Sequence, residues 1–260
     1  MQKAKTHPRC KKPLPRAGLC FVTLAFLLCV FSGCALGSDG VHAPGPEPEV
    51  TTVPAPTAPP LYSLAGRRTP IRLLLEEHTC GAYKVRYPSV YEEGAELLSF
   101  AVTKAFDAFA RELTSQGLSG RLDFTVEYND RGLLAIVITA YGSDGREQSR
   151  TAACFDCATA SRIGLTACFG SGDESFRFAL ADTVTERLRA AGNSVISFLP
   201  PMDDDRLFWF DEEGLTLMYR KYEVCDAEAG MPEVFLSYEE LEGYLNPDAL
   251  LRRVPYFDAQ

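Results

Sequence analysis

The side chains best suited to chemistry in this chain are its cysteines and one downstream histidine. Cys154 and Cys157 form a Cys-x-x-Cys pair, and His78 stands two positions before Cys80. A structural zinc ion takes four ligands, usually from two such pairs, and the other cysteines stand at spacings that match no zinc pattern. A redox pair begins a helix and has a lowered thiol pKa, but this pair lies in a strand-like run. We therefore predict buried structural cysteines, with neither a metal nor another cofactor.

Nucleophilic catalysis has little support in the sequence. No histidine follows His78, so a Ser-His-Asp triad would have to use it, and no Gly-x-Ser-x-Gly elbow is present. A dyad of Cys80 and His78 remains an alternative. Disulfide bonds are compatible with a site outside the cytoplasm. The pairing stays open for five cysteines, an odd number: Cys80, Cys154, Cys157, Cys168 and Cys225.

Two acidic runs could supply the paired carboxylates that hydrolyse sugars. They are Asp203-Asp204-Asp205 and Glu239-Glu240. Both fall at expected loop or helix-surface positions, so we interpret them as solvated charges. The first run lacks the spaced ligands of a calcium loop.

Aromatic residues near the C-terminus are the candidates for ligand contact. In the run Phe208-Trp209-Phe210, alternation along a strand places Phe208 and Phe210 on one face and Trp209 on the other. If the first two enter the core, Trp209 is exposed and becomes the first candidate for binding. Tyr219 and Tyr222 are the second candidates.

Hydrophobic periodicity predicts the elements that hold these residues. An apolar residue at every fourth position, from Leu97 to Leu113, indicates a helix over 95–116, and a similar stripe indicates one over 176–191. The predicted fold is α+β, with a largely antiparallel sheet, two main helices and a short C-terminal helix over 238–245. Strands are expected at 82–88 as an edge strand, 122–128, 133–141 as the central strand, 151–156, 163–166, 207–210, 215–219 and 234–236.

The N-terminus has the pattern of an export signal. Residues 1–18 are basic, and the apolar run Leu19–Phe31 has 13 residues. As a helix this run would be about 20 Å long, which is shorter than the bilayer core of roughly 30 Å. A basic segment before a short apolar run is typical of a signal peptide rather than a spanning helix. We expect residues 1–33 to be this signal.

The segment Phe31-Ser32-Gly33-Cys34 resembles a lipobox, the site at which bacterial lipoproteins receive lipid on cysteine and are cleaved before it. The resemblance implies lipidation of Cys34 and a protein anchored to the cell membrane on its extracytoplasmic side. An uncleaved anchor and an ordinary cleaved signal are the alternatives. Residues 34–64 are predicted to be a linker, because seven prolines between 43 and 60 prevent helix and sheet.

Charge excludes one class of partner. Six of the 26 Lys and Arg residues, and none of the 35 Asp and Glu residues, lie in residues 1–33. The remainder therefore has 20 basic and 35 acidic residues, a net charge of −15. Nucleic acid requires a basic surface and is an unfavourable partner. A basic protein would be attracted, although the acidity can also serve solubility alone.

The C-terminal third resembles the extracytoplasmic domain of RsiV-type anti-sigma factors, which also occurs in some peptidoglycan deacetylases and lipoproteins. The similar residues are a strand, turn and strand over 208–219, then Tyr222-Glu223-Val224, Gly230-Met231-Pro232-Glu233-Val234 and Tyr238-Glu239-Glu240-Leu241. Weaker similarity covers 83–90 and 155–169. The resemblance implies one domain over 65–260, with two intertwined subdomains at about 80–170 and 171–250.

The resemblance also implies a function. Sensor members bind lysozyme, a basic protein, so the sequence predicts a non-enzymatic domain that binds lysozyme, another basic protein or peptidoglycan. Members often have Gly-Gly-Ala-His after the central strand, whereas this chain has Gly142-Ser143-Asp144-Gly145 and no histidine there. A role for that histidine is therefore not expected. An accessory cell-wall hydrolase or deacetylase and a structural envelope lipoprotein are the alternatives.

Overall fold

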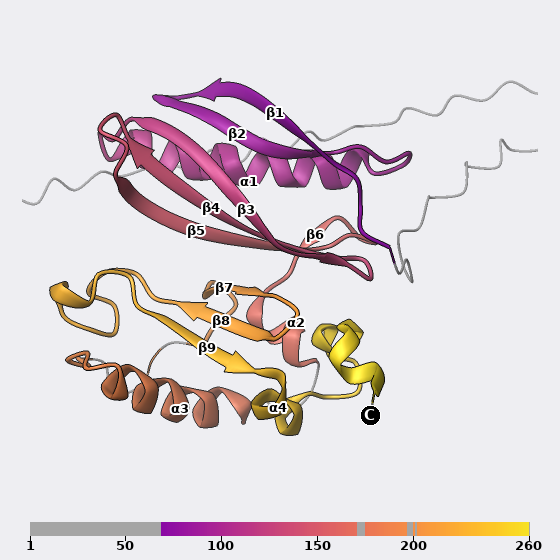
Figure 1. The fold of residues 1–260 in the computed structure, drawn as a ribbon, viewed down its shortest axis with the longest axis vertical. Coiled ribbons are helices and arrows are strands. Elements are labelled where there is room, and N and C mark those ends of the chain that lie inside the picture. The colour runs from indigo at the N-terminus through magenta and orange to yellow at the C-terminus, as the bar shows by residue number, and fades with distance from the viewer. Residues whose placement is uncertain (1–68, 171–174, 197–199, 201, 260) are drawn as a thin grey trace, which may run out of the picture. The chain divides into compact units, whose positions relative to one another are not determined.

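The computed structural model describes residues 69–170, 175–196, 200 and 202–259, which belong to one compact unit. Cys34, the expected signal and the expected linker lie outside the described residues. Figure 1 shows two sheets and several helices, as predicted for an α+β fold. The first sheet contains β1 (Leu73–Cys80), β2 (Tyr83–Val90), β3 (Gly120–Asp130), β4 (Leu133–Gly142), β5 (Glu147–Asp156) and β6 (Ser161–Arg162), in that spatial order.

The second sheet follows in the chain and is smaller. It contains β7 (Leu207–Phe210), β8 (Gly214–Met218) and β9 (Glu233–Ser237), all antiparallel. The α-helices are α1 (Glu96–Ser115), α2 (Leu165–Phe169), α3 (Phe176–Ala190) and α4 (Tyr238–Leu241). Short 3₁₀ helices are η1 (Ala227–Ala229), η2 (Glu242–Tyr244), η3 (Leu250–Arg253) and η4 (Pro255–Ala259).

The elements form layers. Helix α1 covers one face of the first sheet, the second sheet packs on its other face, and α3 lies beyond the second sheet (Figure 1). This arrangement buries both faces of β4, the predicted central strand. Ala135 and Val137 face the second sheet, whereas Ile136 and Ile138 face α1. A continuous apolar run is what a strand covered on both faces requires.

Helix α1 forms where the apolar stripe predicted it. Leu98, Val102 and Phe106 are buried against the sheet, whereas Leu97 is 67% exposed. The helix packs against β2 and crosses from β2 to the parallel strand β3. Such a parallel crossover needs a long connection, usually a helix.

The prediction that β2 is an edge strand is wrong, because β1 pairs with it. Strand β1 was not predicted. The predicted edge character is still visible in Pro88, which lacks an N–H group to donate. Pairing of β2 with β3 involves only Tyr83, Lys84 and Val85, so Pro88 lies beyond the residues that pair with β3. The predicted strand at 163–166 is also wrong. That segment leads into α2, where Leu165, Cys168 and Phe169 are buried.

Strand β3 changes faces along its length. Leu122 packs on the α1 side, whereas Tyr128 packs between the two sheets. Residues six apart in a regular strand share a face, but the register shifts between Val126 and Tyr128, as in a β-bulge. The shift carries the end of the strand towards the second sheet, where the Tyr128 ring contacts that of Phe210 with centroids 5.4 Å apart.

Candidate functional site

Two adjoining cavities form a groove beside β5, between α1 and the second sheet. One has a volume of about 570 Å³ and is lined by Glu147–Thr151 of β5. The other has a volume of about 600 Å³ and continues along Thr151–Cys154. Phe109, Glu112 and Arg220 line both cavities. We call this continuous depression the β5 groove.

The β5 groove has a wall from each of the two layers that cover the first sheet. Helix α1 supplies Phe109 and Glu112 on one side. The second sheet and its loops supply Leu207, Met218 and Arg220 on the other. The groove therefore depends on residues that are about a hundred positions apart in the chain.

Ion pairs formed by Arg150 line the outer cavity of the groove. Arg150 on β5 donates to Glu233 on β9 at 2.6 Å and to Glu147 at 3.0 Å. The first pair joins the two sheets directly. Burial lowers the pKa of Arg150, but the two carboxylates outweigh it and the pKa is raised, so the side chain stays a cation.

Arg206 lines the cavity that continues along Thr151–Cys154, and its side chain is engaged in structural contacts. Its side chain is 8% exposed, donates to Glu223 at 2.5 Å and lies over the Tyr219 ring, with Cζ 4.6 Å from the centroid. Burial raises the pKa of Glu223, but the hydrogen bonds from Arg206 and from the Arg220 backbone outweigh it, so this pKa is lowered. A planar guanidinium that pairs and stacks at once positions the loop after β8.

The structure separates the three aromatic candidates. Tyr222 is 61% exposed and has a φ of 67°, an uncommon conformation for a non-glycine residue. Its ring lies 5.3 Å from the Lys221 ammonium group, and Lys221 lines the β5 groove. Tyr219 is buried beneath Arg206, and burial raises its pKa well above the ordinary value.

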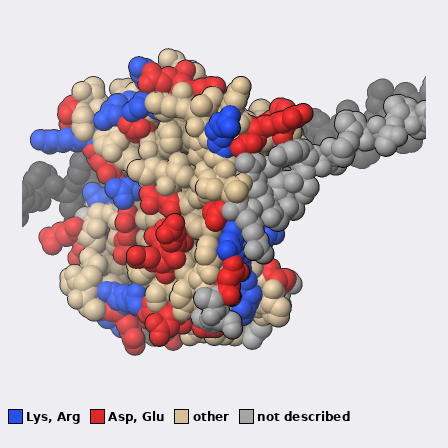
Figure 2. All heavy atoms as spheres, turned by 45° about the vertical axis from the view of Figure 1, so that its right-hand side comes forward, with Lys and Arg blue, Asp and Glu red and all other residues tan. Residues whose placement is uncertain are grey.

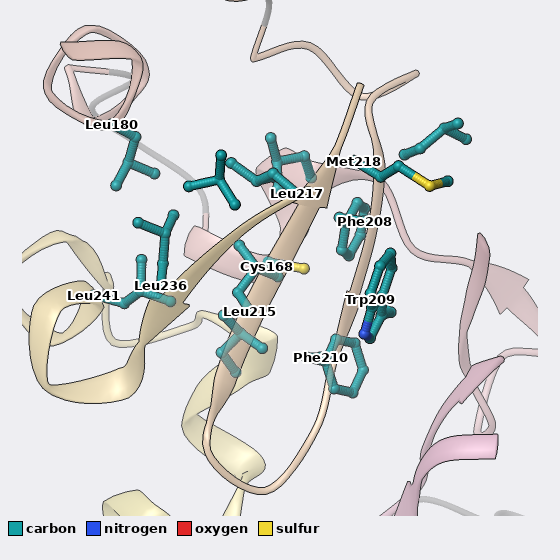
Figure 3. Packing of buried hydrophobic residues seen from close by; sticks show 14 of the residues in the cluster. Cys168, Leu180, Phe208, Trp209, Phe210, Leu215, Leu217, Met218, Leu236 and Leu241 are labelled. Carbon is teal, nitrogen blue, oxygen red and sulfur yellow. The ribbon is translucent and has the colours of Figure 1, made fainter. Parts of the chain in front are cut away.

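The expectation that Trp209 is exposed is wrong, because Trp209 is only 7% exposed. In Figure 3 its ring lies on the side of β7 towards the strands of the first sheet, whereas Leu236 lies towards Leu180 of α3. Alternation did place Trp209 on its own face. That face is covered by the first sheet, a layer that the local sequence does not reveal.

The cysteine candidates are engaged in structural contacts. Cys154 packs between the sheets and Cys157 on the α1 side, as expected for strand residues three apart. All five downstream cysteines are buried free thiols. Burial raises the pKa of Cys154 and that of Cys168, so neither thiol is activated as a nucleophile.

His78 and Cys80 meet the same residue of α1. The His78 Nε2 lies 2.7 Å from Asp107 Oδ1, and the Cys80 thiol lies 3.7 Å from the Asp107 carbonyl oxygen. Burial and the Asp107 carboxylate raise the pKa of Cys80, which opposes thiolate formation. Within the described ranges, no group of three or more His, Cys, Asp and Glu side chains is arranged to hold a metal ion.

The two acidic runs occupy the positions that the sequence suggested. Asp204 accepts a hydrogen bond from the Thr166 backbone at 2.7 Å, and Asp205 is exposed in the groove. Glu240 accepts from the Ser237 backbone in a capping box and pairs with Arg187. Each run is thus a loop or a helix end.

The sequence did not indicate the groove residues Arg150, Arg206 and Arg220. Isolated arginines carry no motif, and their grouping depends on contacts between distant strands. Among the helices of the described part, none combines the length and apolar character needed to cross a bilayer.

Comparison with known proteins supports the fold. No family model and no curated protein matches the sequence. A crystal structure of a DUF3298 family member from Bacteroides fragilis aligns with a TM-score of 0.50 at 13% identity, over 74% of this chain and 99% of that one. A DUF3298 family protein from Pseudomonas aeruginosa aligns with a TM-score of 0.48 at 18% identity, over 72% and 98%. The chain thus resembles, in fold, a member of an uncharacterised domain family.

Proposed function

We propose that this protein is a lipid-anchored, extracytoplasmic binding protein and that the β5 groove is its ligand site. The observation that supports this most directly is the groove itself. It is open and has a volume within the usual range for a binding cleft. Four exposed charged residues that line it form no ion pair with a described residue: Glu112, Asp205, Arg220 and Lys221. The lipobox-like segment at Cys34 supports the location.

Lysozyme is the first proposed ligand, and another basic protein or peptidoglycan is the alternative. The chain after residue 33 has a net charge of −15. Figure 2 shows Asp and Glu side chains gathered in the middle of one face. Opposite charge increases the rate of association and favours the matching partner. Glu112 and Asp205 are exposed in the groove and would be the local attraction for a cationic side chain.

Binding is tested by passing lysozyme over the immobilised full chain in detergent micelles, at low and at high salt. We expect retention that weakens as salt rises. The variant Glu112→Gln/Asp205→Asn should retain less lysozyme than Glu93→Gln/Glu96→Gln, which removes the same charge from exposed residues away from the groove. No retention at low salt rejects lysozyme, and equal losses in both variants reject the groove as its site. Peptidoglycan fragments are tested in the same way.

Anchoring is tested separately by feeding cells labelled palmitate. We expect the label on the intact chain and none on Cys34→Ala. Equal labelling of the two, or no label on either, would refute the lipid anchor without bearing on the groove.

A further inference from the structure

Among the described strands, none pairs with one edge of β5 over most of its length. Strand β4 pairs with β5 on one side through nearly the whole strand. On the other side, β6 pairs only with Phe155 and Asp156. Residues Glu147–Thr151 are exposed or half-buried and line the outer part of the β5 groove.

Two hydrogen bonds show which backbone groups face this open side. The Ile163 N–H donates to the Cys154 carbonyl at 2.8 Å, and the Arg162 guanidinium donates to the Ala152 carbonyl at 2.8 Å. Neither donor is part of β4, so Cys154 and Ala152 direct their backbone away from it. Backbone direction alternates along a strand, so the N–H and C=O of Arg150 face the groove. Within the described residues, neither group has a hydrogen-bond partner.

The walls of the groove select the kind of chain that can reach this edge. Helix α1 borders it on one side and the second sheet on the other, and the Arg150–Glu233 pair spans the two sheets. A single extended chain can enter between these layers. The edge of a second copy would bring its own covering layers, which the walls exclude.

In the outer part of the groove, where Glu233 is paired with Arg150, the remaining charges of the two walls differ. Arg220 and Lys221, on the second-sheet side, are exposed and form no ion pair with a described residue. Glu112 lies on the α1 side. A carboxylate in the groove would be attracted to Arg220 and Lys221 and repelled by Glu112. This difference sets the direction of one side chain in an added strand.

We propose that the Glu147–Thr151 edge of β5 receives an extended peptide segment of a partner as an added strand, with a carboxylate side chain towards Arg220 and Lys221. This inference rests on the proposed binding function of the groove and names the class of ligand. In strand addition, backbone hydrogen bonds supply affinity and alternate side chains supply specificity. An addition at Arg150 would also satisfy the open backbone groups of an edge strand.

The test uses the full chain in detergent micelles and a set of synthetic peptides. Each is roughly seven residues long, as for a typical strand, and alternates Thr and Val with one Glu moved through every position. Binding is measured by fluorescence polarisation of the labelled peptide, and hydrogen exchange is measured at the Arg150 amide. We expect at least one peptide to bind and to slow exchange at Arg150.

Three matched controls identify the mode of binding. A version of the best peptide with its central backbone nitrogens methylated should lose binding, because it cannot donate to the Arg150 carbonyl. Replacing its Glu by Gln should weaken binding roughly two- to fivefold, the loss expected for an exposed ion pair. The variant Arg220→Gln/Lys221→Gln should weaken the Glu peptide and leave the Gln peptide unchanged, whereas Arg146→Gln, in an exposed turn, should change neither.

The outcomes separate this inference from the proposed function. If no peptide binds, or if the methylated peptide binds equally well, strand addition is wrong even when lysozyme is retained. If peptides protect Arg150 but neither lysozyme nor peptidoglycan is retained, strand addition stands and the proposed ligands fail. Protection of Arg150 that rises with protein concentration in the absence of peptide would show a second copy at this edge and overturn the peptide proposal.

Discussion

The first sheet has two incomplete edges, and they are protected in different ways. Strand β1 pairs with no described strand on its outer side. The Tyr91 N–H donates to the Arg72 carbonyl, and the alternation that follows directs the backbone of Leu75 and Glu77 to that outer side. Glu77 is charged and pairs with Lys84. The β5 edge instead lies between α1 and the second sheet. Charge deters pairing at an open edge, whereas walls restrict which chain can approach.

This contrast indicates that, of these two edges, the β5 edge is the one suited to selective pairing. An exposed edge accepts any strand unless charge prevents it. A recessed edge accepts a single chain, and the side chains of its walls discriminate between candidates. Four predictions test the contrast, in order of decreasing effect.

Proline substitutions should distinguish paired from unpaired backbone. The Ala153 N–H faces β4, opposite Ile136, so Ala153→Pro should lower the free energy of unfolding by about 3 kcal/mol or more. Leu75→Pro, on the outer side of β1, should lower it by about 0.5 kcal/mol. Urea denaturation of both variants measures the difference. Similar losses would show that the assigned backbone directions are wrong.

Replacing Arg206 should destabilise the fold around the cavity that its side chain lines. We expect Arg206→Gln to lower the free energy of unfolding by about 2 kcal/mol, because it leaves the half-buried Glu223 carboxylate without its cation. The matched variant Arg146→Gln, which changes an exposed arginine, should have no measurable effect. Thermal unfolding of the two variants is the measurement, and equal melting temperatures would contradict a structural role for Arg206.

The same pair predicts a dependence on pH. The pKa of Glu223 in the folded chain lies below its ordinary value of 4.5. Its contribution to stability is therefore present above about pH 4.5 and is lost as the pH falls through the lower, folded pKa. The variant Glu223→Gln, which cannot titrate at this position, should lose less stability than the natural chain between about pH 5 and pH 3. A steeper loss in the variant would reverse the assigned sign.

The charges on β1 should matter for association rather than for folding. Glu76→Thr/Glu77→Thr removes two exposed carboxylates from an open edge, so self-association should increase slightly in sedimentation velocity. The same two substitutions at Glu112 and Glu186, both on helices, should not increase it. If neither double variant associates, charge is not what protects this edge.

Local sequence patterns predicted much of the fold. The stripe of α1, the continuous apolar run of β4 and the β7–β8 hairpin were recognised, because each depends on neighbours within a few positions. Strand β1 was missed, since Leu73–Cys80 is mostly exposed and has no clean alternation. Which residues of the α1 stripe are buried, and that Leu97 is exposed, also required knowing how the helix meets β2.

The candidate site was much less predictable. Tyr222 was named and lies beside the groove residue Lys221, but Trp209 was expected to be exposed and is not. Arg150, Arg206 and Arg220 were not named. Their grouping depends on the Arg150–Glu233 and Arg206–Glu223 pairs, which join residues 83 and 17 positions apart. Periodicity indicates which face of a helix or strand is buried. To predict a groove, one must also know where α1 and the second sheet, the two layers that cover the first sheet, end beside β5.

The sequence by itself determined the two main helices and the start of the short C-terminal one, most of the strands, the alternation that sets Trp209 apart from its neighbours, and the acidity of the chain after residue 33. These follow from covalent order and from side-chain preferences that act over a few residues. The tertiary structure alone decided that the second sheet covers Trp209, that the β3 bulge turns Tyr128 towards that sheet, and that the β5 edge is recessed. Those features arise from packing between distant segments, where burial of apolar surface selects one arrangement among many that the local pattern allows.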